Sequence, residues 1–297
     1  MKEGEEVQQI TTNVYVDTQF SKRVSPGCNY SFVVTSEGIV MIDTPMLPTY
    51  AIRWRDEIAE KGEVRYVINT EHHPDHISGN YFFSGTVVSH QGVREMLSAP
   101  IEKVIAPEMI KAAVAASMDL REYILWRYQL ADPEGLALAQ NYQLRPPTIT
   151  FTEQLTVYSG DHTFELIHLP GHTPYQVGVY VPQERVIFTG DNFINEWQSS
   201  LAYCCPLEWI ESLKKIEAMD VDFIVPGHGE VGDKMALREF AEFIQGVIDI
   251  IRRAIDQGIT KEEAVKSISF EELRPARHPG VEQQQMNITR LYEMLSK

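Results

Sequence analysis

Four short polar turns, each directly after an apolar and strand-like run, constrain the fold of this chain more than any other feature of its sequence. The first turn spans residues 69–76 and reads NTEHHPDH, and the others are PGH at 170–172, TGD at 189–191 and PGHG at 226–229. Side chains from such distant turns can share one site only if the preceding strands end along the same edge of the fold. The sequence therefore predicts an α/β protein with a polar site at the carboxyl ends of its strands.

The apolar runs also occur in two similar halves. The run 40–42 leads to Asp43 and the run 186–190 leads to Asp191, and a helix-like segment, a strand-like segment and a histidine turn follow each of them. The strand-like segments are rich in β-branched and aromatic residues, as expected of buried strands. Two βαβ-like halves of this kind predict two sheets packed face to face with helices outside, and residues 1–297 are predicted to form a single domain.

Charge and cysteine content narrow the classes of partner and compartment. The chain has 26 lysines and arginines against 42 aspartates and glutamates, a formal net charge of −16. A field of that sign repels a phosphate backbone and no basic cluster offsets it, so we expect no nucleic acid partner. No apolar run is long enough to cross a membrane, and the amino-terminal residues are acidic. Three cysteines, an odd number, favour a reducing cytoplasm.

The polar turns contain the ligand types that first-row metal ions prefer, namely imidazoles and carboxylates on loops. No cysteine stands among them, so a structural zinc finger is excluded. Their order and context resemble the metallo-β-lactamase superfamily, whose signature is H-x-H-x-D-H after a strand, then a glycine-flanked histidine, an aspartate and a final histidine. The residues that match, within roughly 14–243, are Asp43, His73, Asp75, His76, His172, Asp191 and His228.

The resemblance implies an α/β fold, a four-layer αββα metallo-β-lactamase sandwich, to which two helical segments are added. Simple members of the superfamily lack so long a helical insert as the one at about residues 102–144, and we expect it to fold over the site as a lid. A helical carboxyl-terminal extension is predicted at about residues 261–297, around Pro275 and Pro279.

The resemblance also implies two metal ions, and the motif departs from the usual pattern at the first of them. With Asp75 and His76 fixing the register, Glu71 occupies the first histidine position, and His72 falls on the intervening position, where its side chain should point away from the metals. A local shift that substitutes His72 for Glu71 is the alternative. The implied ligands are Glu71, His73, His172 and Asp191 at the first ion, and Asp75, His76, Asp191 and His228 at the second.

Zinc is the expected cofactor, with two ions per chain. A carboxylate oxygen is a harder ligand than an imidazole nitrogen. Glu71 therefore makes iron or manganese an alternative in the first site. The extra negative charge at Glu71 distinguishes this chain from the family pattern that it otherwise resembles.

A site of this kind implies a hydrolase that uses a metal-activated hydroxide. The expected substrate is a small ester, lactone, amide or similar electrophile, and Asp75 is the predicted catalytic residue, which orients the hydroxide and handles its proton. An iron-dependent oxygen-using or redox enzyme on the same fold is the alternative, and a non-catalytic binding protein is a third. The expected partner is a small-molecule substrate, and a homodimer is compatible with the sequence.

Three further polar residues are predicted to lie outside the set of metal ligands. Asp43 is expected to brace the metal loops by hydrogen bonds. His90 is expected to serve packing around the site, and His162 is expected on the surface.

Overall fold

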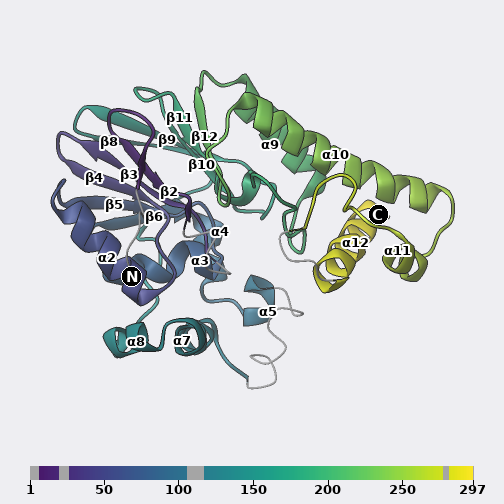
Figure 1. The fold of residues 1–297 in the computed structure, drawn as a ribbon, viewed down its shortest axis with the longest axis horizontal. Coiled ribbons are helices and arrows are strands. Elements are labelled where there is room, and N and C mark those ends of the chain that lie inside the picture. Colours follow the sequence, from purple (N-terminus) through teal and green to yellow (C-terminus); the bar gives the residue numbers. More distant parts are fainter. Residues whose placement is uncertain (1–6, 20–26, 106–116, 277–280, 297) are drawn as a thin grey trace.

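The computed structural model describes residues 7–19, 27–105, 117–276 and 281–296 of the chain. Two sheets lie face to face at its centre, and helices cover both outer faces (Figure 1). Helices α9 (Pro206–Ala218) and α10 (Lys234–Asp256) lie along one side of the pair of sheets, and α2 (Pro48–Ala59) lies on the other side. None of the helices among the described residues combines the length and the apolar character that a membrane span needs.

The first sheet has seven strands in the order β1-β2-β3-β4-β5-β6-β7, which is also their order along the chain. Strands β1 to β4 pair antiparallel, whereas β4 to β7 pair in parallel, so β4, β5 and β6 end at the same edge. The bounds are β1 Gln8–Gln9, β2 Val14–Asp17, β3 Tyr30–Thr35, β4 Gly38–Ile42, β5 Val64–Ile68, β6 Thr86–His90 and β7 Ile149–Phe151.

The second sheet has five strands in the order β12-β11-β10-β9-β8. Its pairs are antiparallel except for β11 and β12, which run in parallel and therefore also end at a common edge. The bounds are β8 Gln154–Ser159, β9 His162–His168, β10 Val177–Val181, β11 Val186–Phe188 and β12 Phe223–Val225.

Helices fill the connections between the strands. Helix α3 begins within the first histidine turn, at Pro74, whose fixed φ suits a first helical turn. The bounds are α2 Pro48–Ala59, α3 Pro74–Ile77, η1 Ser78–Phe82, α4 Gln91–Met96, α5 Ile101–Val104, α7 Leu120–Ala131, α8 Pro133–Leu136, η3 Ala137–Ala139, η4 Gly190–Asn192, α9 Pro206–Ala218, α10 Lys234–Asp256, α11 Lys261–Ser267 and α12 Val281–Leu295.

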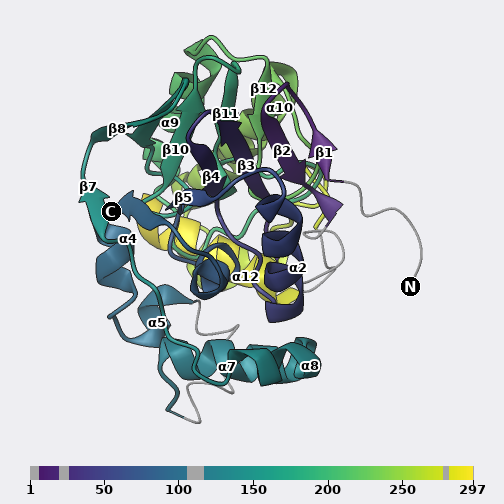
Figure 2. The ribbon, with the colours of Figure 1, turned by 90° about the vertical axis from the view of Figure 1, so that its left-hand side faces the viewer.

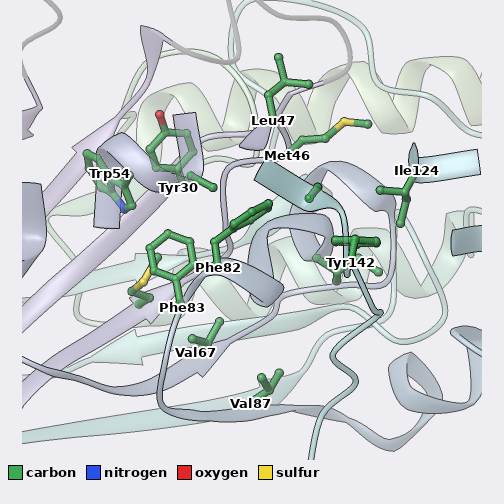
Figure 3. Packing of buried hydrophobic residues seen from close by; sticks show 14 of the residues in the cluster. Tyr30, Met46, Leu47, Trp54, Val67, Phe82, Phe83, Val87, Ile124 and Tyr142 are labelled. Carbon is green, nitrogen blue, oxygen red and sulfur yellow. The ribbon is translucent and has the colours of Figure 1, made fainter. Parts of the chain in front are cut away.

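Alternate residues along the strands face different layers of the molecule. In β4, Met41 packs toward the outer helices while Val40 faces the second sheet. In β11, Phe188 faces the first sheet while Ile187 packs toward the helices of the opposite side. Strands buried on both faces need a layer on each side, so the predicted four-layer α/β sandwich is confirmed. Figure 3 shows the outer core of the first sheet, where the rings of Tyr30 and Trp54 meet edge-on at 4.7 Å.

The described parts of the helical insert pack on this outer core, with α7 and α8 side by side below the sheets (Figure 2), and residues 106–116 of the insert lie outside the described residues. Helix α7 begins at a capping box in which Asp119 and Glu122 each accept a hydrogen bond from the other's backbone N–H. The hydroxyls of Tyr128 and Tyr142 both donate to the carbonyl of Ser78, at 3.3 and 3.1 Å. Because Ser78 directly follows α3, these bonds attach the insert to the first histidine turn.

The carboxyl-terminal extension packs against the helices of the opposite face. Helix α12 lies beside α10 and α11 (Figure 1), and Ile288 and Leu291 join the buried cluster that α9 and α10 form with the second sheet. Helix α11 begins at a second capping box, between Thr260 and Glu263. The extension is therefore part of the core of this face rather than a detached tail.

The prediction that His162 lies on the surface is wrong. Its side chain is 4% exposed, and its two ring nitrogens lie 2.9 Å from the carboxylates of Asp161 and Glu184. Glu184 also accepts hydrogen bonds from Thr11 and Asn13. These partners come from three separate turns, so no local pattern in the sequence indicates that His162 is enclosed.

Glu184→Gln is expected to lower the free energy of unfolding at neutral pH by about 1–2 kcal/mol. The substitution removes the negative charge that strengthens the hydrogen bonds to this side chain. Burial alone would raise the pKa of Glu184, but the hydrogen bonds from Thr11, His162 and Asn13 outweigh it and hold the pKa below its usual range. The carboxylate therefore stabilises the fold above the unfolded-state pKa, and this stabilisation is lost as the pH falls through the folded-state pKa.

Urea unfolding at pH 7 and at about pH 3.5 measures this effect, and the difference between wild type and variant should shrink at the lower pH. Glu153→Gln, which changes an exposed glutamate before β8, is the control and should alter stability little at either pH. An equal difference between wild type and Glu184→Gln at both pH values would show that the carboxylate charge is not the stabilising feature.

Candidate metal centre

The predicted site residues meet at the edge where β4, β5, β11 and β12 end. The turn of residues 69–76 follows β5, Asp191 lies in η4 directly after β11, and His228 follows β12. His172 lies in the connection between β9 and β10. The structure therefore brings side chains that are up to 157 positions apart, Glu71 and His228, into one buried group, as the alternation of strands and polar turns predicts.

The first cluster consists of Glu71, His73 and His172, whose ligand atoms all lie within 4.8 Å of one another. His172 presents Nε2, which is 3.4 Å from Nδ1 of His73 and 3.8 Å from Oε2 of Glu71. Nδ1 of His73 is in contact with the same carboxylate oxygen. One carboxylate and two imidazoles thus point their donor atoms into a common space.

The second cluster consists of Asp75, His76 and His228. His228 presents Nε2, which is 3.5 Å from Oδ2 of Asp75 and 3.3 Å from Oδ1 of Asp191. His76 also presents Nε2, again 3.3 Å from Oδ1 of Asp191. Together with Asp191, this cluster offers two imidazoles and two carboxylates.

Asp191 lies between the two clusters. Its Oδ1 faces His76 and His228, and its Oδ2 is 3.6 Å from Nε2 of His172. A side chain on Gly227 would place its Cβ 1.9 Å from Oδ1 of Asp191, so a glycine is required for the His228 turn to approach this closely. The geometry gives Asp191 the position of a residue shared by two sites.

His72 lies outside both clusters. It is buried, and neither of its ring nitrogens has a hydrogen-bond partner among the described residues. Burial and the charge of His73 lower its pKa to about 3, so the ring is neutral at physiological pH. Glu71, not His72, points its side chain toward His73, His76 and His172.

The donor set fits a divalent metal. Two ligands on a tetrahedral ion with bonds of about 2.0–2.2 Å lie about 3.4 Å apart. Neighbouring ligand atoms in this site are separated by 3.3–3.8 Å, except for the closer contact of His73 with Glu71. Three of these buried atoms, Oε1 of Glu71, Nε2 of His76 and Oδ1 of Asp191, have no hydrogen-bond partner among the described residues. Buried polar atoms left unpaired are costly, and a cation would satisfy all three.

Neighbouring charges keep the two central carboxylates ionised. Burial would raise the pKa of Glu71, but His73, His172 and His76 lower it to about 2. Burial would likewise raise the pKa of Asp191, but His228 and His76 hold it well below its usual range. Both carboxylates are therefore anionic at neutral pH, which is the form that binds cations.

Asp43 makes the bracing hydrogen bonds expected of it. Its Oδ2 lies 2.9 Å from Nδ1 of His76 and accepts from the hydroxyl of Thr70, and its Oδ1 accepts from the backbone N–H of Thr70. The contact with Nδ1 leaves Nε2 of His76 directed at Asp191, a common arrangement for metal-binding histidines. Asp43 has φ +56°, an uncommon backbone conformation for a residue other than glycine, and its three side-chain bonds stabilise it.

Two more residues brace the turns that carry the ligands. The side chain of Asn29 donates to the carbonyls of Pro226 and Gly229, at 3.0 and 2.8 Å, and so holds the turn of His228 from both sides. The hydroxyl of Ser199 lies 3.3 Å from Nδ1 of His172. Ser199 lies in a segment without helix or strand periodicity, so no pattern pointed to it.

His90 has the packing position predicted for it. Its ring stacks on the ring of Tyr175, with 5.5 Å between the ring centroids, and its centroid lies 4.4 Å from that of His168. Its Nδ1 accepts from the N–H of Gly92 and its Nε2 donates to the carbonyl of Thr152. Both ring nitrogens are thus occupied by the backbone.

Comparisons with known proteins agree with this geometry. The model of the metallo-beta-lactamase superfamily matches residues 26–228. A linear primary-alkylsulfatase from a Pseudomonas species is 23% identical over 259 residues, which are 79% of this chain and 48% of the relative. The chain therefore spans about half the length of that curated relative.

Solved structures with the same fold cover most of the chain. A metallo-beta-lactamase from Pontibacter korlensis superposes with a TM-score of 0.57 at 20% identity, over 81% of this chain and 98% of that one. A double mutant of the sec-alkyl sulfatase PisA1 superposes with a TM-score of 0.67 at 15% identity, over 96% of this chain and 49% of that one. The family match and the alkylsulfatase support the predicted class of enzyme, a hydrolase. The chain belongs to the metallo-beta-lactamase superfamily.

Proposed function

We propose that this chain is a metal-dependent hydrolase of small esters, and that alkyl sulfate monoesters are the substrate class to test first. The pair of donor clusters that share Asp191 supports the dependence on a metal, because a cation would satisfy the buried unpaired atoms of Glu71, His76 and Asp191. Zinc suits this set of imidazoles and carboxylates, and the carboxylate of Glu71 makes manganese or iron an alternative in the first site.

A divalent ion, when bound, lowers the pKa of a water molecule and polarises the electrophile. In this proposal Glu71, His73, His172 and Asp191 hold the first ion. Asp191, Asp75, His76 and His228 hold the second. Asp75 has the further role of accepting the proton of the attacking water at a carboxylate oxygen, because its side chain stands at the edge of the cluster, 11% exposed, where a substrate can reach it.

The helical insert supplies groups suited to an anionic ester. Burial and the nearby charge of Asp75 raise the pKa of the Tyr123 hydroxyl, while Arg127, which hydrogen-bonds to it from the next turn of α7, lowers it. Tyr123 is itself buried, so in this proposal the partly exposed guanidinium of Arg127 beside it would bind the oxygens of a sulfate group. In this proposal the insert is the lid of the site. The alkylsulfatase, which is similar over 79% of this chain, supports the same substrate class.

Substrate assays on the metal-free and metal-loaded protein test the proposal. The protein is treated with a strong chelator and then given zinc or manganese, and hydrolysis of decyl sulfate, phenyl acetate, a lactone and a β-lactam is followed. Turnover should disappear with the metal and return with it, while circular dichroism stays unchanged, because three apolar cores hold the fold. Full turnover in protein that contains no measurable metal would overturn the proposal.

The second candidate is an iron-dependent oxygen-using enzyme, and the carboxylate of Glu71 is the observation that favours it. A harder first site binds iron better than a site with a third imidazole would. Metal analysis of protein produced in defined medium separates the two candidates. Stoichiometric iron together with oxygen uptake would favour this second candidate, whereas zinc or manganese with ester cleavage would favour the hydrolase.

A further inference from the structure

One ring nitrogen of His172 faces the first cluster, and Ser199 holds the other. The hydroxyl of Ser199 lies 3.3 Å from Nδ1 of His172 and 3.2 Å from the carbonyl oxygen of Ser200. A carbonyl can only accept, so the single hydroxyl proton is donated to Ser200, and the hydroxyl oxygen accepts from Nδ1–H of His172. This arrangement puts the ring proton on Nδ1 and leaves the lone pair on Nε2, the atom that faces Glu71 and Asp191.

The segment that carries Ser199 is irregular, and the carboxyl-terminal extension fixes its position. Asn287 of α12, which is fully buried, donates from Nδ2 to the carbonyl of Ser199 at 3.1 Å and accepts at Oδ1 from the N–H of Leu201 at 2.8 Å. The amide oxygen and the amide nitrogen of Asn287 thus bond the backbone on either side of Ser200. Asn287 therefore fixes the path of the backbone at Ser199.

Three further hydrogen bonds place the same segment between the extension and the His172 turn. On one side, Gln198 donates from its backbone to the carbonyl of Pro275 at 3.0 Å and from its side chain to the carbonyl of Arg274 at 2.6 Å. On the other side, the N–H of Cys205 donates to the carbonyl of Gly171 at 2.7 Å. The contacts thus run without a break from the extension to the residue before His172.

The second cluster is braced from elsewhere. Asp43, at the end of β4, holds Nδ1 of His76, and Asn29, just before β3, holds the turn of His228. Both bracing residues belong to the first sheet and its connections. A disturbance of α12 should therefore reach the first cluster and leave the second unchanged.

We propose that Ser199 and Asn287 are positioning residues for the first metal. Together they hold His172 in the orientation and tautomer that leave Nε2 free to bind the ion, which makes helix α12 a part of the metal centre. The proposal rests on the role of His172 as a ligand, which belongs to the proposed function above. Outer groups that orient a metal-binding histidine typically change metal affinity by about 10–100-fold when they are removed.

Zinc affinity tests the proposal without reference to turnover. Metal-free Ser199→Ala and Asn287→Ala proteins are titrated with zinc against a chromophoric chelator, so that the two binding constants are resolved. The zinc affinity of the first site is the binding constant that His172→Ala loses. This affinity should fall by ~10–100-fold relative to wild type in both variants, whereas the affinity of the second site should stay within a factor of about two. Thr289→Ala is the matched control, because Thr289 donates only within α12, to the carbonyl of Gln285.

Conservative variants separate positioning from a general packing role. Asn287→Asp keeps the acceptor for Leu201 but loses the donor to Ser199, so it should weaken the first site as much as Asn287→Ala does. Ser199→Thr retains the hydroxyl and should restore most of the affinity that Ser199→Ala loses. If both sites weaken equally, or if Ser199→Ala binds both ions as wild type does, the proposal is wrong.

His172→Ala distinguishes a failure of this inference from a failure of the proposed function. If His172→Ala still binds two zinc ions with unchanged affinity, His172 is not a ligand and the metal centre itself is wrongly assigned. If His172→Ala loses one ion while the Ser199 and Asn287 variants keep both, the ligand assignment stands and only the positioning role is overturned.

Discussion

Asp75→Asn is expected to lower turnover by about 100-fold or more, which corresponds to about 2.7 kcal/mol of transition-state stabilisation. The substitution keeps the size of the side chain and one oxygen, but the amide cannot accept the proton of the attacking water. Asp75 lies at the edge of the cluster, with its Oδ2 3.5 Å from Nε2 of His228, and its backbone carbonyl accepts from the thiol of Cys28. Its backbone is thus held by a contact that does not depend on the side-chain charge.

Steady-state rates at equal metal content, measured on the best substrate of the panel, decide this prediction. Asp256→Asn, at the exposed end of α10, is the control and should be indistinguishable from wild type. A variant at Asp75 that keeps more than about a tenth of the wild-type rate, with both metals bound, would exclude a proton-handling role for this carboxylate.

Substitution of Glu71 is expected to have the second large effect, this time on metal binding. Glu71→His should retain two ions and shift the first site toward zinc over manganese, because a neutral imidazole replaces a hard anionic ligand. The shift is measured by competition between the two metals at the weaker site. An unchanged preference would mean that Glu71 is not among the ligands of that site.

Much of the fold could be predicted because its signals are local. The strands β4 and β11 are short apolar runs that end in a polar turn, and both proved to be buried on both faces. The order of the turns also predicted which side chains meet, since strands that end at one edge bring their following loops together. The orientation expected for His72, away from the common space, followed from the register that Asp75 and His76 set for the motif that resembles the family signature.

The residues that were missed depend on contacts between distant parts of the chain. Asn287 and Ser199 are 88 positions apart, and neither lies in a recognisable motif. His162 was misplaced for the same reason, because Glu184 reaches it from a separate turn and is itself held by a hydrogen bond from Asn13. A polar residue in an irregular segment carries no periodicity that reports whether a distant helix will cover it. Such positions become evident only when the packing of the whole molecule is known.

Metal content per chain in Glu71→Ala and His72→Ala tests most directly whether Glu71 completes a two-metal centre. Both proteins are loaded with excess zinc, freed of loosely bound metal and analysed for zinc against protein concentration. Glu71→Ala should fall from about two ions per chain toward one, because the first cluster loses its carboxylate, while His72→Ala should stay near two. The opposite pattern, with two ions retained in Glu71→Ala and one lost in His72→Ala, would contradict the assignment of Glu71 and show that His72 is the ligand.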